Sequence, residues 1–291
     1  MSYKNFTLTV ISAFILTACG GSHHSDSTGG NGYYVNGPSN PNSGNTTVTE
    51  PFKLKEQFSS FTSSVAEDGT ASVTKKTTAD SWAGSSRVSV ENLAQSSDGV
   101  HPVVNGIYQT DYQNEDTGEL GDIIFGATEG TRGAAYARYG IDMSMSSAKE
   151  NETVNTLFYV GEETTTMPTT GSVTYLGKTI AANPNVMEEI RNTRAGASIG
   201  NYYGDSSFEV DFGSKKLTGI LNNWQSDGST MPIMKPVSIE ADIKANTFQG
   251  TANSTGYAEG KFYGPDAANI AGSFDDKDQG LFGVFGANKQ E

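Results

Sequence analysis

The sequence predicts an all-β protein in which a β-rich N-terminal domain precedes an antiparallel up-and-down β-barrel. Glycine, threonine and serine are abundant and leucine is scarce, a composition that favours strands and turns over helices. From about residue 153 onward, apolar and polar residues alternate with the two-residue period of a half-buried strand. Repeated short strands with glycine turns favour a barrel, because closure of the sheet removes its exposed edges.

Residues 1–18 have the features of a lipoprotein signal peptide. Lys4 supplies positive charge, and the apolar run over residues 6–16 is too short to span a bilayer. The run leads into the string Leu-Thr-Ala-Cys, the pattern of a lipobox, in which the thiol takes a lipid. We therefore expect Cys19, the only cysteine in the sequence, to be lipidated. The next residue is Gly20 and not the Asp typical of inner-membrane retention, which favours the outer membrane.

Residues 19–50 are expected to form a flexible stalk between the anchor and the fold. They are almost entirely Gly, Ser, Asn, Thr and Pro, which cannot build a core. His23 and His24 lie in this stalk without the fixed geometry of a metal site. With Cys19 used for the anchor, no thiol remains for a disulfide, a nucleophile or a metal ligand. The net charge of −14 argues against nucleic acid and anionic lipid as partners.

The folded part is expected to have two domains, residues 51–152 and residues 153–291. The first has irregular strand-like segments and a cluster of aromatic residues, Tyr108, Tyr112, Phe125, Tyr136 and Tyr139. In the second, residues 208–212 alternate before a Gly-Ser-Lys-Lys turn and a further strand, which predicts a hairpin. Further strands are expected over residues 237–243, 257–263 and 281–285.

The sequence gives little support to an enzyme. Residues 196–200 read Gly-Ala-Ser-Ile-Gly, the pattern of a serine hydrolase elbow, but no histidine follows Ser198 in the chain. Residues 275–280 are rich in aspartate and suggest calcium, although they lack the alternating ligand positions and the distal glutamate of a calcium loop. A solvated hairpin turn is the favoured interpretation of this segment.

Four segments of the C-terminal half resemble the lipoprotein barrel of transferrin-binding protein B. Residues 159–177 are similar to its opening strands. Two later strings, Gly-Lys-Phe-Tyr-Gly-Pro at residues 260–265 and Gly-Val-Phe-Gly-Ala-Asn-Lys at residues 283–289, are similar to its closing strands, together with residues 270–274 between them. The same barrel occurs in factor H binding protein and in smaller haem binders such as hemophilin.

The resemblance implies a handle domain followed by an eight-stranded barrel, in a noncatalytic lipoprotein on the extracellular side of the outer membrane. It also implies a host protein or haem as ligand, and export by an outer-membrane translocator of the surface lipoprotein assembly modulator type. A TonB-dependent transporter is a further expected partner. Haem is slightly favoured as the ligand, because the single lobe matches the smaller members of the family in size. Two alternatives stay open: binding of transferrin or factor H, and a structural or adhesin role.

His101 is the candidate haem ligand. It lies in residues 98–104, a stretch that glycine and proline make loop-like, and Tyr108 and Tyr112 follow it. A haem iron needs one neutral imidazole with apolar or aromatic side chains covering the macrocycle, which the two tyrosines would supply. The alternative is an ordinary surface histidine.

Overall fold

The computed structural model of the protein describes the strands and their short connections. All of these lie in one compact unit, Val48–Glu291. Cys19, His23, His24 and residues 196–200 lie outside the described residues. The described ranges are 50–54, 58–65, 71–78, 100–113, 120–130, 135–145, 152–183, 201–226 and 233–291.

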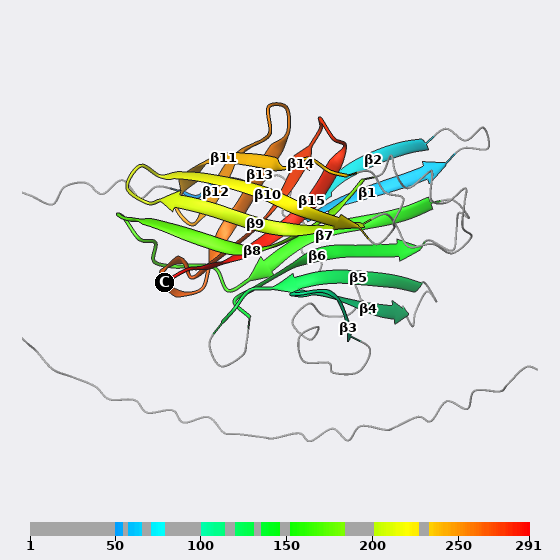
Figure 1. Ribbon diagram of the computed structural model, residues 1–291, viewed down its shortest axis with the longest axis horizontal. Coiled ribbons are helices and arrows are strands. Elements are labelled where there is room, and N and C mark those ends of the chain that lie inside the picture. Colours follow the sequence, from blue (N-terminus) through cyan, green and yellow to red (C-terminus); the bar gives the residue numbers. More distant parts are fainter. Residues whose placement is uncertain are drawn as a thin grey trace, which may run out of the picture. The chain divides into compact units, whose positions relative to one another are not determined.

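The first half of the unit is a seven-stranded antiparallel sheet (Figure 1). Its order is β2-β1-β7-β6-β5-β4-β3, so a meander of five strands is extended by the hairpin of β1 and β2. This pairing joins β1 to β7 across the sheet, with Phe58 opposite Phe158. The strands are β1 (Phe58–Val65), β2 (Ala71–Thr78), β3 (Val100–Val104), β4 (Ile107–Gln113), β5 (Leu120–Ala127), β6 (Ala137–Met145) and β7 (Glu152–Gly161).

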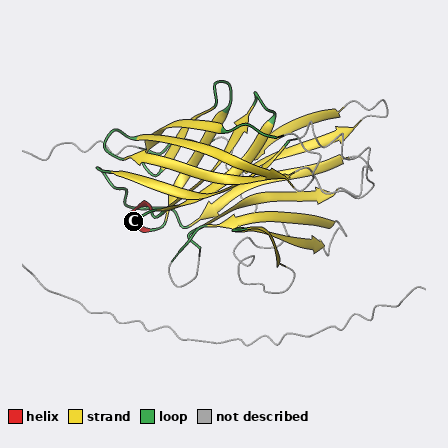
Figure 2. Ribbon diagram, in the orientation of Figure 1, coloured by secondary structure: helices red, strands yellow, loops and turns green. Residues whose placement is uncertain are grey.

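The second half is a closed antiparallel barrel of eight strands, each paired with its neighbours in the chain, and β15 pairs with β8 to close it. The fold class predicted from the sequence is therefore confirmed. Figure 2 shows how fully strands dominate, and the only helix in the described ranges is the single-turn η3, Pro265–Ala267. The barrel strands are β8 (Ser172–Ala182), β9 (Asn201–Asp211), β10 (Lys216–Ser226), β11 (Val237–Lys244), β12 (Thr247–Ala252), β13 (Tyr257–Tyr263), β14 (Asn269–Asp276) and β15 (Leu281–Lys289).

The predicted hairpin is formed by β9 and β10, joined by a tight turn. Asp211 Oδ1 accepts hydrogen bonds from the backbone N–H groups of Gly213 and Ser214, at 2.9 and 3.1 Å, and so fixes the turn. The strand β11 shows strict alternation of buried and exposed residues, as expected for one wet and one dry face. None of the described helices is both long and apolar enough to cross a membrane.

The division between the two halves differs from the predicted boundary at residue 153. Strand β7 pairs with β6 and β1 of the sheet, and the barrel begins only with β8 at Ser172. Residues 157–159 of β7 are all buried, and runs of consecutive buried residues also occur in the barrel strands β8 and β9. The apolar pattern therefore identifies β7 as a strand without saying which sheet it joins.

Aromatic rings in the barrel lie directly opposite glycines on the neighbouring strand. Phe208 pairs with Gly219, Phe248 with Gly260, Phe285 with Gly272 and Phe274 with Gly283. A methyl group built on any of these glycines would lie less than 3 Å from the opposite ring. The rings then meet one another across the interior, with the centroids of Phe208 and Phe285 4.8 Å apart. The glycines thus make the space that the buried rings fill.

We expect the substitution Gly219→Ala to lower the free energy of unfolding by about 1–3 kcal/mol, the usual effect of overpacking a core. The added methyl group would displace the Phe208 ring, which is itself fully buried. Urea denaturation measures the change. Gly213→Ala, in the exposed turn of the same hairpin, is the matched control and should change the free energy by less than about 0.5 kcal/mol. Equal effects of the two substitutions would contradict the packing role of Gly219.

Candidate functional site

One face of the sheet packs against the outer wall of the barrel. Side chains that point out of β8, β13, β14 and β15 form a second buried cluster with side chains of β4 to β7. Among its members are Tyr139, Ile141 and Tyr159 from the sheet, and Ile180, Tyr263 and Val284 from the barrel. The barrel wall therefore has a part covered by the sheet and a part exposed to solvent.

The ring of Tyr139 packs tightly between the sheet and the barrel. A methyl group on Gly286 of β15, or on Gly126 of β5, would lie within 3 Å of its ring. The ring is thus held between two glycines, one in each half of the unit. This arrangement leaves no freedom for the sheet to slide along the wall without losing packing.

Polar groups also cross the covered wall. Glu259 on β13 is fully buried and accepts hydrogen bonds from Tyr257, at 2.6 Å, and from Tyr159 of the sheet, at 3.3 Å. At the border, Lys261 pairs with Glu163 at 2.5 Å, in the segment that joins β7 to β8. Burial would raise the pKa of Glu163, but the hydrogen bonds from Lys261 and Asn246 outweigh it and lower the pKa.

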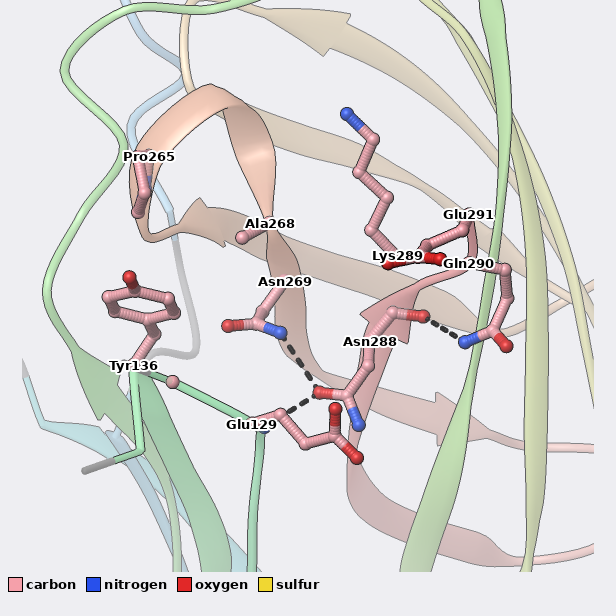
Figure 3. Close-up of a pocket in the computed structure, with 10 residues that line it drawn as sticks. Glu129, Tyr136, Pro265, Ala268, Asn269, Asn288, Lys289, Gln290 and Glu291 are labelled. Atoms are coloured by element: carbon pink, nitrogen blue, oxygen red, sulfur yellow. Dashed lines mark hydrogen bonds between the residues drawn. The ribbon is translucent and has the colours of Figure 1, made fainter. Parts of the chain in front are cut away.

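An open pocket of about 350 Å³ lies where the segment between β5 and β6 meets the barrel (Figure 3). Its wall is contributed by three parts of the chain that are far apart in the sequence. It is lined by Glu129, Gly130 and Tyr136 from the sheet side, Pro265, Ala268 and Asn269 near η3, and Asn288, Lys289, Gln290 and Glu291 at the end of β15.

Two asparagines form the polar floor of this pocket. Asn269 and Asn288 are directly paired in the β14–β15 ladder. Asn288 Oδ1 accepts hydrogen bonds from the backbone N–H of Glu129, at 2.8 Å, and from Asn269 Nδ2, at 2.9 Å. Within the described residues, the side-chain oxygen of Asn269 meets no hydrogen-bond donor, although the residue is only 2% exposed. An unpaired buried acceptor of this kind costs about 1–3 kcal/mol.

The structure places the sequence-predicted haem residues on β3 and β4. Residues 100–104 form an edge strand and not a loop, because the edge of a sheet tolerates Pro102, which cannot donate to a ladder. His101 occupies the ladder position opposite Gln109, while Tyr108 is opposite Pro102. These two positions belong to opposite faces of the sheet. Tyr108 is 39% exposed with its ring 5.9 Å from that of Phe125, and Tyr112 lies further along β4.

The aspartate-rich segment 275–280 comprises the end of β14 and the turn that leads into β15. Asp276 accepts hydrogen bonds from Asn253 and Gln279, and Asp278 from Ser254 and Thr255. These carboxylates tie two neighbouring turns together. In the described part of the chain, no group of three or more His, Cys, Asp or Glu side chains has the arrangement of a metal site.

Sequence reasoning did not identify the pocket residues. Asn288 lies in one of the strings that resemble the closing strands, but its partner Glu129 is 159 positions away in the chain. Nothing local marks Glu129 or Asn269 as part of a site. Only the pairing of β14 with β15 and the contact with the sheet bring them together.

The buried tyrosines predict how stability depends on alkaline pH. Burial raises the pKa of Tyr139 and Tyr175, and burial together with nearby carboxylates raises those of Tyr159 and Tyr263. In the unfolded chain the same hydroxyls ionise near pH 10 (about the model-peptide value). Their contribution to stability is therefore complete below about pH 10 and is lost as pH rises above it, because the unfolded state releases protons first.

A spectrophotometric titration tests this prediction by following tyrosinate absorbance. In the native protein we expect part of the tyrosine signal to appear only at the pH where circular dichroism reports unfolding. The urea-unfolded chain serves as the reference and should titrate in one step near pH 10. A single step at that pH in the native protein, with the fold intact, would contradict the prediction.

Comparison with known proteins matches the barrel. The family model for the C-lobe and N-lobe beta barrels of Tf-binding protein B covers residues 167–289. An uncharacterized protein of Haemophilus influenzae is 34% identical over 160 residues, which are 53% of this chain and 49% of the relative. Transferrin-binding protein B of Moraxella catarrhalis is 32% identical over 187 residues, 47% of this chain and 26% of the relative.

A third relative, the Neisserial heparin binding antigen of Neisseria meningitidis serogroup B, is 38% identical over 89 residues, 28% of this chain and 17% of the relative. The matched regions thus span about half or less of these curated relatives. A crystal structure of transferrin-binding protein B from Actinobacillus pleuropneumoniae is 20% identical, with 80% of this chain and 99% of that chain covered and a TM-score of 0.43.

Two of these relatives carry the names of binding proteins. The family match begins just before β8 and ends with the last residue of β15, so it coincides with the closed barrel. The barrel of this chain, residues 167–289, is thus similar to the C-lobe and N-lobe barrels of Tf-binding protein B.

Proposed function

We propose that this chain is a surface-exposed lipoprotein of the outer membrane that binds a host factor for nutrient acquisition. The observation that carries the proposal is the barrel, residues 167–289, which matches the barrels of transferrin-binding protein B. Relatives of that name bind transferrin, as the name states. This chain shares the barrel with these relatives but not most of their length. The relatives therefore support the general class of function, host-factor binding, more strongly than the identity of the ligand.

The geometry supports a binding function by presenting a fixed surface. The sheet and the barrel share a buried cluster and a wedge at Tyr139, so that residues from both halves keep their relative positions. A preorganised surface binds without a large ordering cost. The pocket at the junction offers both polar groups and apolar walls, the composition typical of binding sites.

Presentation at the cell surface depends on the N-terminal segment. The proposal assigns the lipid to Cys19 and a spacer role to residues 19–50, which as a random coil would reach roughly 30 Å. It also assigns export to an outer-membrane translocator of the surface lipoprotein assembly modulator type, and transfer of the captured nutrient to a TonB-dependent transporter.

Among host ligands, the charge of the chain disfavours the polyanion named in one relative. Heparin is highly sulfated, and its recognition requires clustered lysine and arginine. This chain carries 33 acidic against 19 basic residues. We therefore propose a protein ligand or haem. Haem is slightly preferred, because the single-lobe chain is similar in size to the smaller haem binders. Transferrin and factor H are the alternative protein ligands. An adhesin or structural role is the alternative in which no nutrient is bound.

Capture from host plasma tests the general proposal. The chain from residue 20 onward, immobilised on resin, should retain at least one plasma component that withstands washing in physiological salt. An unrelated acidic protein of similar net charge is the control, because it reports charge-driven retention. If both resins retain the same components, or neither retains any, the structural alternative is favoured over the receptor.

A haemin titration tests the preferred ligand. If His101 binds the iron, the wild-type chain should give a shifted Soret band that His101→Ala abolishes. Glu209→Gln, an exposed position on β9 of the barrel, is the control, and it should leave the band unchanged. The same Soret band in all three proteins would remove His101 as ligand. No band in any of them would remove haem and leave protein ligands.

A further inference from the structure

The orientation of the two asparagines at the pocket floor follows from one unambiguous donor. The backbone N–H of Glu129 can only donate, so the Asn288 atom that it meets at 2.8 Å has to be Oδ1. The same oxygen meets the side chain of Asn269 at 2.9 Å, which has to offer its Nδ2. Asn269 Oδ1 is therefore turned away from Asn288 and into the pocket, as Figure 3 shows.

This oxygen is an acceptor that the protein leaves unused. Asn269 is 2% exposed, and its Oδ1 meets no donor within the described structure. Buried acceptors are almost always paired, so an unpaired one that lines a pocket points to a donor supplied from outside. The oxygen is nearly covered in the free chain, so a donor from outside reaches it only when a neighbouring side chain of the pocket shifts.

The rim of the pocket favours a positively charged donor. Glu129 and Glu291 both line it, and Lys289 is the one basic residue among the described lining residues. The ammonium group of Lys289 is turned to η3, where it donates to the carbonyl of Asp266 at 3.5 Å. The half-buried ring of Tyr136 forms a further wall (Figure 3), against which a cation or its aliphatic stem can pack.

We propose that this pocket receives the cationic end of a lysine or arginine side chain from a partner polypeptide. Asn269 Oδ1 accepts a hydrogen bond from the ammonium or guanidinium group, and the carboxylate of Glu129 attracts its charge. The aliphatic stem lies along Tyr136 and Pro265. This inference rests on the proposed function, the binding of a host factor, and specifies the chemistry of one anchor of that partner.

The barrel wall beside the pocket favours a polypeptide over a free small cation. Asn288 is paired with Leu176 of β8, and Leu176 is followed across the wall by Ser207 and Ile220 in the same register row. Leu176 and Ile220 are 46% and 37% exposed. Strands lie about 4.8 Å apart, so these two side chains are roughly 5 and 14 Å from the strand of Asn288. A chain anchored in the pocket can cover both.

Nuclear magnetic resonance of the isotope-labelled chain tests the proposal with three small probes. These are the N-acetyl methylamides of lysine, arginine and norleucine, the last being the uncharged analogue of lysine. We expect the basic probes to shift the backbone amide of Glu129 and the side-chain amide of Asn269 at millimolar concentration. The norleucine probe should leave both signals in place. Absence of shifts with both basic probes, or equal shifts with norleucine, would overturn the proposal.

Two variants locate the binding energy. Glu129→Gln keeps the backbone donor to Asn288 and removes only the rim charge, so it should weaken the basic probes about two- to fivefold. Glu209→Gln removes an exposed charge from β9 on the open wall of the barrel and is the matched control, with no change expected. Asn269→Leu should abolish the response of the Glu129 amide. Its spectrum away from the pocket reports whether the variant is folded.

The capture experiment separates this inference from the proposed function. Should the full chain retain a plasma protein that Glu129→Gln and Asn269→Leu retain equally well, with no response to the basic probes, the pocket inference is wrong and the receptor function stands. Conversely, pocket shifts with neither capture of a plasma component nor a Soret band from haemin would support the cation site and reject the proposed function. Weaker capture by both variants than by Glu209→Gln supports both.

Discussion

The placement of aromatic rings on glycines across the ladder is the constraint on which this structure depends. The interior of an eight-stranded barrel must be filled by side chains, but it has no room for a phenylalanine at every inward-facing position. Pairing Phe208, Phe248, Phe274 and Phe285 with glycines gives each ring the volume of two residues. The closing strands are rich in glycine for this reason and not because they are flexible.

The same device holds the sheet on the barrel. Tyr139 lies between Gly126 and Gly286, so that one ring fills the gap between a strand of the sheet and a strand of the wall. Around it, the buried cluster contributes apolar area, and Tyr159 with Glu259 contributes a polar contact. Since packed interfaces of this kind have one low-energy arrangement, loops carried by either half keep a defined spacing.

The border of the covered wall is where a binding site can form most readily. One register row runs from Tyr263, buried under the sheet, through Asn269 and Asn288 at the border, to Leu176 and Ile220 in solvent. Along this row the side chains change from buried to solvent-exposed over a few strands. Polar groups at the border are partly desolvated, and there hydrogen bonds and charges count for more than on an open surface. The pocket occupies this border.

The sequence by itself determined the strands, the hairpin of β9 and β10 and the resemblance of the barrel to that of transferrin-binding protein B, because alternation, turn residues and ordered motifs are local features. It did not determine that β7 joins the sheet, since an apolar strand can pair in either half. Likewise, only the tertiary structure made Pro102 an edge residue, where a proline is tolerated, so that a segment that looked like a loop is a strand. The pocket was decided entirely by the tertiary structure. Glu129 and Asn288 meet through a contact between residues 159 positions apart, and no local pattern can record that contact.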